Sequence, residues 1–310
     1  MVKAPLPSVA LIAGPTASGK SALALRLAEA TGGAVVNADS AQVYRDLPIL
    51  SAAPSAEDRA RAEHLLYGVL DGADPWSAAD WANMAKREIA RLHREDRLPI
   101  LVGGTGLYLR TLLDGIAPVP AIDPGIRAQV RAASVGENLA ALAPLDPIAA
   151  ATLNPGDTTR IARALEVVKS TGKTLAEWQE HRQGGIGEEI DLKALVLLPL
   201  RPWLYDRCDR RFAEMVGQGA LDEVRSLFSR NLDPDLPVMR AIGVPELGAH
   251  LRGECSMDEA IAAGQQATRR YAKRQYTWFA HQPPPGWPRF HDALEGEVID
   301  RALALFGVAG

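Results

Sequence analysis

Short apolar runs alternate with helical patterns over the first third of the chain. The runs at 9–13, 34–37 and 98–102 have the length and composition of buried strands. Helical patterns follow or separate them, and one opens with a capping box at Ser77-Ala78-Ala79-Asp80. Helices are therefore expected over 21–30, over 77–95 and from Gly106 to about Asp114. Strand, turn and helix repeated in this order predict an α/β fold with a parallel, doubly wound sheet.

The pattern changes after Pro118 and Pro120. From there to about Glu189 the sequence has helical patterns and no convincing strand, the clearest being 158–170 with Gly172 as its stop. Apolar residues 195–198 then predict a fourth sheet strand. Two helices follow, one with Pro202 in its first turn and one over 257–281. We expect a core of residues 1–119 and 190–310, interrupted by a helical insertion at 120–189.

Composition narrows the class of protein. The 310 residues are 47% hydrophobic and 23% charged, which is ordinary for a soluble chain. The formal net charge is −4, so any nucleic-acid binding has to come from a local basic patch. Cys208 and Cys255 form no C-x-x-C pair, which argues against a disulfide framework or a zinc site. With no signal peptide or membrane-spanning stretch recognised, we expect a cytoplasmic monomer that does not bind membranes.

The most informative motif is Gly14-Pro15-Thr16-Ala17-Ser18-Gly19-Lys20-Ser21. It fits G-x-x-x-x-G-K-[ST], the phosphate-binding loop, and lies between a predicted strand and a predicted helix. Glycines let successive N–H groups wrap an anion, and the helix N-terminus adds positive potential. Lys20 supplies a point charge, and the Ser21 hydroxyl can ligate Mg²⁺. The motif predicts phosphate or diphosphate binding.

Nucleoside triphosphatases with this loop carry an acidic residue at the end of a neighbouring strand, where it positions Mg²⁺. Here the strand at 98–102 ends in Gly-Gly-Thr, and the well-placed acid is Asp39, after the second strand. Asp39 is therefore a candidate for proton transfer. The alternative is that Asp39 contacts a magnesium ion through its bound water, or that it caps a turn. Thr105 is either a substrate contact or a helix N-cap.

Two later segments are rich in basic residues. Arg207 and Arg211 share one helical face and suit a diphosphate, although a solvated charged face with Asp206 and Asp209 is an equal alternative. The run 269–278 mixes basic and aromatic residues, as nucleic-acid contacts often do. The aromatic residues of that run are more simply interpreted as core.

In their order along the chain, five motifs resemble bacterial tRNA dimethylallyltransferases, the IPP transferase family. They are the phosphate loop, Asp39-Ser40-Ala41-Gln42-Val43-Tyr44, Gly103-Gly104-Thr105-Gly106-Leu107-Tyr108, Arg160 to Val167 with Ser170 to Thr174, and Ala272 to Trp278. The resemblance covers about Val9 to Trp278. It implies transfer of a five-carbon group from dimethylallyl diphosphate to the exocyclic N6 amine of the adenine 3′ of the anticodon, position 37, in tRNAs that read codons beginning with U.

The resemblance also implies roles for individual residues. Asp39 would be the general base, Lys20 and Arg211 would hold the diphosphate, Thr16 would touch the donor, and Ser21 would bind Mg²⁺. The insertion would grip the anticodon stem-loop. The implied tRNA contacts are Asp39, Ser40, Ala41, Gln42, Thr105, Arg127, Thr159, Arg160, Ile161, Ala162, Arg163, Arg240, Lys273, Arg274 and Gln275.

The sequence departs from the family pattern at 46–54, which lacks the usual lysine, and at Val244-Pro245. Both departures concern expected tRNA contacts. Two other functions remain open from the residues themselves: a small-molecule kinase that uses ATP at the same loop, and a nucleotide-gated binding module. The missing strand-end acid counts against both.

Overall fold

The computed structural model describes residues 5–308 and divides the chain into two compact units. The first, called the core unit, runs up to Leu112 and resumes at Ile186, and the second, the helical unit, spans Leu113–Gly185. The sequence pattern predicted two boundaries as well, but placed them a few residues later, at 119/120 and 189/190. The interpretation that no signal peptide precedes the core depends partly on residues 1–4, which lie outside the described range. None of the described helices combines the length and apolar character needed to cross a membrane.

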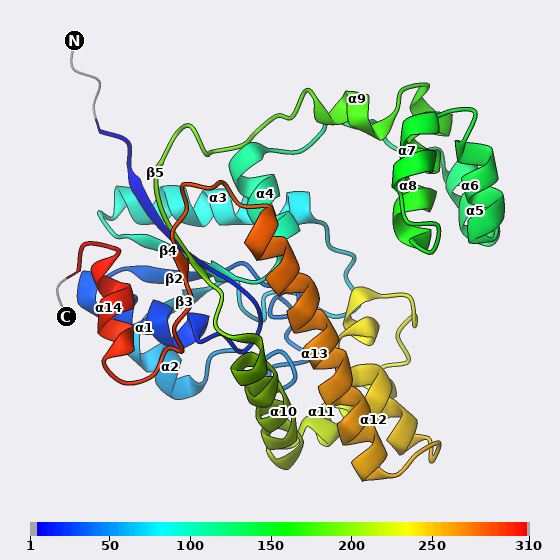
Figure 1. The fold of residues 1–310 in the computed structure, drawn as a ribbon. Helices are drawn as coiled ribbons and strands as arrows, with labels where there is room; N and C mark the ends of the chain where they lie inside the picture. Colours follow the sequence, from blue (N-terminus) through cyan, green and yellow to red (C-terminus); the bar gives the residue numbers. More distant parts are fainter. Residues whose placement is uncertain (1–4, 309–310) are drawn as a thin grey trace. The chain divides into compact units, whose positions relative to one another are not determined.

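A six-stranded parallel sheet forms the centre of the core unit, in the order β3-β2-β4-β1-β5-β6 (Figure 1). The predicted α/β class is confirmed. Four strands were predicted, and β3 and β6 were missed because they have only three and two residues. The strands are β1 (Ser8–Ala13), β2 (Ala34–Asn37), β3 (Glu63–Leu65), β4 (Pro99–Gly103), β5 (Asp191–Leu197) and β6 (Arg289–Phe290).

The helices of the core unit begin and end where local chemistry directs them. Ser77 forms the predicted capping box with Asp80, and Gly32 closes the first helix in the left-handed conformation, with φ 65°. The helices are α1 (Lys20–Thr31), α2 (Ala56–Arg61), α3 (Ala78–Arg94), α4 (Gly106–Asp114), α10 (Arg201–Gly217), α11 (Ala220–Ser229), α12 (Val244–Leu251), α13 (Met257–His281) and α14 (Val298–Ala304), with a 3-10 turn at Pro237–Arg240.

Packing on the sheet fixes the strand ends. Leu23 and Leu27 of α1 are fully buried in a cluster with the sheet residues Ile12 and Val102. Toward α3, the buried Trp81 stacks on Tyr108 at 4.6 Å between ring centroids. The Trp81 Nε1 donates a 2.8 Å hydrogen bond to the carbonyl of Asn37, the last residue of β2. This contact holds the backbone immediately before Asp39.

The helical unit is a separate small bundle. Its core is made by Val130, Leu142, Ile161 and Leu165, all at most 1% exposed. As predicted, no strand occurs between 120 and 189, and Gly172 ends α8 with φ 71°. The helices are α5 (Pro124–Ala132), α6 (Val135–Leu142), α7 (Pro147–Thr152), α8 (Thr158–Thr171) and α9 (Leu175–Gln179).

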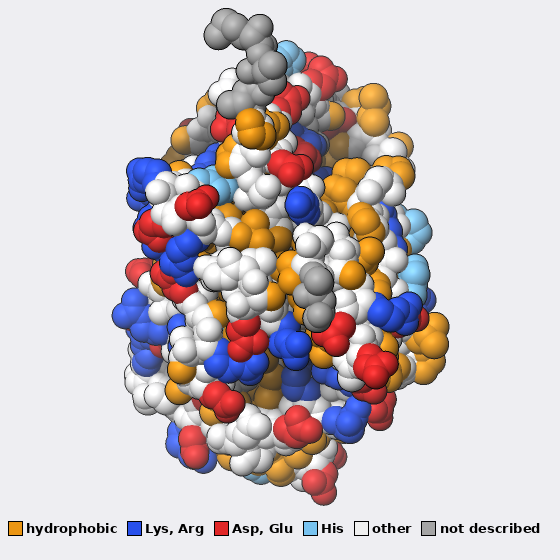
Figure 2. All heavy atoms as spheres, turned by 90° about the vertical axis from the view of Figure 1, so that its left-hand side faces the viewer, with side chains coloured by type: hydrophobic (Ala, Val, Ile, Leu, Met, Phe, Trp, Pro, Cys, Tyr) orange, Lys and Arg blue, Asp and Glu red, His pale blue; other side chains and the backbone are white. Residues whose placement is uncertain are grey.

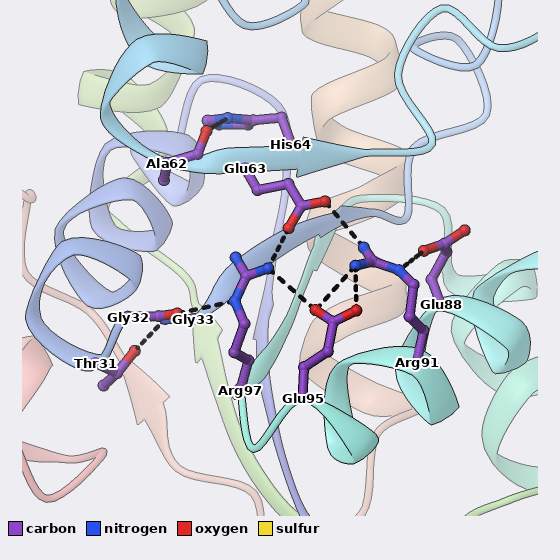
Figure 3. A network of polar contacts seen from close by, with 10 residues as sticks. All are labelled: Thr31, Gly32, Gly33, Ala62, Glu63, His64, Glu88, Arg91, Glu95 and Arg97. Atoms are coloured by element: carbon purple, nitrogen blue, oxygen red, sulfur yellow. Dashed lines mark hydrogen bonds and ion pairs between the residues drawn. The ribbon is translucent and has the colours of Figure 1, made fainter.

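An ion-pair network covers the β3 edge of the sheet (Figure 3). Arg91 pairs with Glu63, Glu88 and Glu95, each at 2.9 Å, and Arg97 pairs with Glu63 and Glu95. These side chains are partly exposed, so each pair contributes only about 0.2–1 kcal/mol. The network joins the edge strand to the end of α3 and to the turn that enters β4.

Gly103, at the end of β4, makes a close approach that allows no side chain. A Cβ there would lie 2.0 Å from the Ala38 carbonyl oxygen. Gly103→Ala should lower the free energy of unfolding by about 1–3 kcal/mol, because the new methyl group forces the end of β4 away from Ala38, which follows β2. Urea unfolding measures this change. The control is Gly136→Ala in α6, where a Cβ meets nothing within 4 Å; equal destabilisation of both variants would contradict the steric explanation.

Candidate functional site

The phosphate loop follows β1 and begins with a close approach to β5. A Cβ on Gly14 would lie 2.5 Å from the Leu197 carbonyl oxygen, so this position requires glycine. Gly19 precedes α1 with φ 96°, and Ala17 holds a left-handed φ of 62°. Such strain in a non-glycine residue is concentrated at functional sites. The Ser18 Oγ is buried and has no hydrogen-bond partner among the described residues.

Two cations and one carboxylate lie close together at this loop. The Lys20 Nζ donates to the Pro15 carbonyl at 2.6 Å, and Arg211 of α10 donates to the Thr16 Oγ1. Burial lowers the pKa of Lys20 to about 8; the Asp39 charge opposes this shift and the Arg211 charge adds to it. Burial also lowers the pKa of Arg211. Positive charge confined in this way favours an anion over water.

The Asp39 carboxylate is held by its own loop. The Asn37 Oδ1 accepts the Asp39 N–H at 2.8 Å, and the Asp39 Oδ1 accepts the Ala41 N–H at 3.0 Å. The turn-cap interpretation of Asp39 is thus satisfied by one carboxylate oxygen. Thr105 joins this loop as well, because its Oγ1 accepts the Ser40 N–H at 3.0 Å. The sequence analysis gave Asn37 no role, although a polar residue ending an apolar strand was a usable signal.

Gln275 connects α13 to both of the neighbouring loops. Its Oε1 accepts the Thr16 N–H at 2.7 Å, and its Nε2 donates to the Gly104 carbonyl at 2.9 Å. The side chain is 5% exposed. In the structure the amide fixes the phosphate loop against the turn after β4, and the expected contact of Gln275 with tRNA stays a prediction.

A cavity of about 470 Å³ opens beside these groups. Its lining has a polar part, which includes Thr16, Asp39 and Arg211, and an apolar part. The apolar side chains include Leu47, Leu50, Trp76, Tyr108, Cys208, Phe212, Met215 and Ile242. Sequence reasoning missed this apolar part because its members come from separate segments and only packing brings them together. A ligand with an anionic head and a small apolar tail matches both parts.

The basic residues of α10 divide into two groups. Among the arginines of α10, Arg211 lines the cavity and the others do not. Arg207 lies over the Trp203 ring, 4.7 Å from its centroid, and 3.9 Å from Glu295. Arg210 pairs with Asp206 at 3.0 Å. These contacts favour the solvated-face interpretation for Arg207 and Arg210, and an anion contact from Arg207 stays a prediction.

The basic and aromatic run of α13 also divides. Phe279 is fully buried, as the core interpretation expected, and Trp278 packs edge-on against it at 4.9 Å. Arg274 and Tyr271 line the cavity, with the guanidinium 5.5 Å from the ring centroid, while Lys273 is exposed. Figure 2 shows the side of the molecule on which α14 lies, the left of Figure 1, and basic and acidic side chains intermingle there; α13 lies toward the other side.

The other expected tRNA-contact residues differ in exposure. Arg240 is exposed and pairs with Asp235 at the cavity mouth. In the helical unit, Ile161 and Ala162 are buried at 0% and 5% exposed, so a contact from them would have to come from the backbone. Gln42 donates to the carbonyls of Ser51 and Ala52. Arg127, Thr159 and Arg160 are exposed, and Arg163 is partly buried.

Ser21 of the phosphate loop is the residue that the sequence indicated for Mg²⁺. Among residues 5–308, no three His, Cys, Asp or Glu side chains are arranged to hold a metal ion. The Ser21 hydroxyl is exposed in the first turn of α1. Mg²⁺ is commonly held by one or two protein oxygens together with substrate phosphates and water, and a lone serine at this position fits that mode.

The parallel sheet, the phosphate-loop motif after β1 and the cavity at the strand ends define a P-loop α/β protein. A model of the family described as IPP transferase matches residues 42–282. The chain is 62% identical to a tRNA dimethylallyltransferase of Sphingopyxis alaskensis, over 94% of this chain and 96% of that protein. The chain belongs to the IPP transferase family.

Solved structures agree with this assignment. The full-length tRNA isopentenylpyrophosphate transferase of Bacillus halodurans is 32% identical, with a TM-score of 0.71 over 97% of this chain and 95% of that one. A eukaryotic dimethylallyltransferase studied while acting on tRNA is 28% identical, with a TM-score of 0.76 over 88% of this chain and 69% of that one.

Proposed function

We propose that the protein transfers a dimethylallyl group from dimethylallyl diphosphate to N6 of adenosine 37 in tRNAs that read codons beginning with U, releasing diphosphate. The observation that carries this proposal is the divided cavity. Arg211 and the phosphate loop suit an anionic head, and the apolar side chains suit a five-carbon tail. A kinase would need room for a purine and an acid at the end of β4, where the chain has Gly103 and Gly104.

Each polar group has a proposed task. Asp39 accepts the proton of the adenine amine as the new C–N bond forms, which helps because the amine lone pair is delocalised into the ring. The loop N–H groups, Lys20 and Arg211 stabilise the charge on the departing diphosphate. Ser21 holds Mg²⁺, which when bound neutralises part of that charge. Thr16 contacts the donor.

The tRNA side of the site uses the exposed residues. The adenine has to leave its stack, at a cost of a few kcal/mol, to reach Asp39. We infer that Ser40, Ala41, Thr105 and the exposed basic residues of α13 receive the flipped nucleotide and its neighbours. The insertion, with Arg127, Thr159, Arg160 and Arg163, contacts the anticodon stem-loop. A tRNA substrate implies a cytoplasmic enzyme, and we expect a monomer.

One incubation tests the reaction, the donor and the acceptor together. The purified protein, Mg²⁺ and labelled dimethylallyl diphosphate are mixed with unmodified tRNAs that differ only in the anticodon loop. Label should appear on tRNA only where adenine follows the anticodon. Absence of label, with ATP-dependent phosphorylation of a small acceptor, would favour the kinase; tight nucleotide binding without product would favour the gated module.

Donor binding should weaken above about pH 8. The free-state pKa of Lys20 is about 8, and a bound diphosphate raises it, so binding takes up a proton once Lys20 is neutral. Affinity is then constant below pH 8 and falls by up to about tenfold per pH unit above it. Calorimetry with a thiolo analogue of the donor, whose last phosphate pKa is near 6, measures this dependence.

The control for this pH dependence is Lys20→Ala, which removes the titrating group. This variant should bind the donor analogue more weakly than wild type, with an affinity that does not change between pH 7 and 9.5. A wild-type profile that is also flat would show that Lys20 is not the group that titrates.

A further inference from the structure

The helical unit contains one acidic side chain that is completely buried. Glu166 of α8 is 0% exposed and lies among the apolar residues that pack α8 against its neighbours. Its Oε1 accepts a 2.6 Å hydrogen bond from the Arg131 Nε on α5. Its Oε2 is buried and has no hydrogen-bond partner in the described part of the chain.

This arrangement is an inefficient way to join two helices. Burying a carboxylate with one unpaired oxygen costs desolvation free energy, and a single ion pair does not fully offset that cost. An apolar side chain of similar volume at Glu166 would serve the packing as well or better. The carboxylate therefore has a use other than holding α5 to α8.

The charged groups that act with Glu166 are arginines. The Arg131 side chain is 52% exposed although its Nε is fixed, so the outer edge of the guanidinium faces water. Arg127 lies one turn before it on α5, and Arg163 one turn before Glu166 on α8. The Glu166, Arg127 and Arg131 charges all act on Arg163, whose pKa burial lowers. Three guanidinium groups and a single carboxylate thus interact around Arg163, which leaves net positive charge.

The acids that precede α5 and α8 serve as helix caps. The Asp123 Oδ1 accepts the N–H groups of Gly125 and Ile126, and the Asp157 Oδ1 accepts that of Arg160, so both cap helices. Asp157 also approaches Arg160 at 3.4 Å, outside the group of three. The cluster on α5 and α8 is a fixed cationic site on a chain whose formal net charge is −4.

We propose that Arg131 contacts a backbone phosphate of the RNA substrate and that Glu166 is the positioning residue that aims its guanidinium. This inference rests on the proposed tRNA substrate and adds a contact that the sequence motifs did not indicate. Arginine suits phosphate because its planar fork donates two parallel hydrogen bonds. Fixing Nε on Glu166 leaves the outer N–H groups free and removes much of the rotamer entropy that binding would otherwise cost.

The test measures RNA binding directly with the full chain. A fluorescein-labelled anticodon stem-loop with unmodified adenine is titrated with wild type and with Arg131→Gln at salt concentrations from 50 to 200 mM. Loss of one phosphate contact should weaken binding by about tenfold and reduce the slope of log K against log salt by about one. The matched control is Arg26→Gln on α1, whose side chain is also 52% exposed and ion-paired; it should change neither quantity.

Glu166→Met separates positioning from stability. It should weaken stem-loop binding as Arg131→Gln does, with no decrease in melting temperature, and the double variant should bind no worse than the weaker single variant. An unchanged salt slope in Arg131→Gln overturns the inference. Weaker stem-loop binding by Glu166→Met that is explained by a lower melting temperature overturns it as well. If wild type prenylates tRNA while Arg131→Gln binds normally, the inference alone fails. If wild type neither binds the stem-loop nor prenylates tRNA, the proposed function fails with it.

Discussion

Asp39→Asn should lower the rate of prenyl transfer at saturating substrates by about 10²- to 10⁴-fold, the usual contribution of a general base. The amide keeps the shape of the side chain and an Oδ1 that can accept the Ala41 N–H, which Asp39 binds at 3.0 Å. The loop and the tRNA affinity should therefore be retained. Single-turnover transfer of label to tRNA measures the rate, and stem-loop binding measures the affinity.

The control for Asp39→Asn is Asp206→Asn, which makes the same chemical change on the exposed face of α10, where Asp206 pairs with Arg210. It should transfer label at the wild-type rate. A near-normal rate in Asp39→Asn would remove Asp39 as the base and leave it the turn cap that its Oδ1 already provides.

Lys20→Ala should reduce kcat/KM for dimethylallyl diphosphate by about 10²- to 10³-fold, as expected when a group that stabilises transition-state charge is lost. Lys20 is partly buried, and the loss of hydration lowers its pKa to about 8, so its surroundings disfavour the charged form. A bound anion stabilises the charged form of Lys20 and so offsets the cost of its lost hydration. Initial rates at varied donor and saturating tRNA measure the effect.

Lys193→Ala on β5, where the lysine is exposed, is the control for the loss of a positive charge and should leave the donor kinetics unchanged. If Lys20→Ala uses the donor as wild type does, the phosphate loop has no part in the mechanism. The tRNA KM should be nearly the same in both variants, since Lys20 donates within its own loop at 2.6 Å.

Sequence reasoning succeeded where chemistry follows directly from local order. The phosphate loop, Asp39 and Thr105 each come just after an apolar run, and the carboxyl ends of parallel strands meet at one edge of the sheet. Thr16, Asp39, Thr105 and Arg211 accordingly line the same cavity. Helix α13 was predicted to its observed bounds from its long helical pattern, and in the structure Ser256 caps it.

Sequence reasoning failed where a residue's role depends on a distant partner. The amide of Gln275 bonds to Thr16, 259 positions away, and nothing local distinguishes it from a solvent-facing glutamine. Phe212 and Met215 read only as apolar positions of a helix, and their place in the cavity wall depends on how α10 packs. Arg207 and Arg211 look alike in sequence, but the first contacts Trp203 and Glu295 and the second lines the cavity.

The two strands that the pattern missed have a consequence for how the protein behaves at high concentration. The outermost strands, β3 and β6, have only three and two residues, so each edge presents little unpaired backbone. An incoming strand from another molecule would find a short template, flanked at β3 by the charges of Glu63, Arg91 and Arg97. Short, charged edges are a common natural defence against edge-to-edge aggregation. The edge strands are thus too short to be recognised in the sequence, and the same shortness protects the sheet from pairing with another copy.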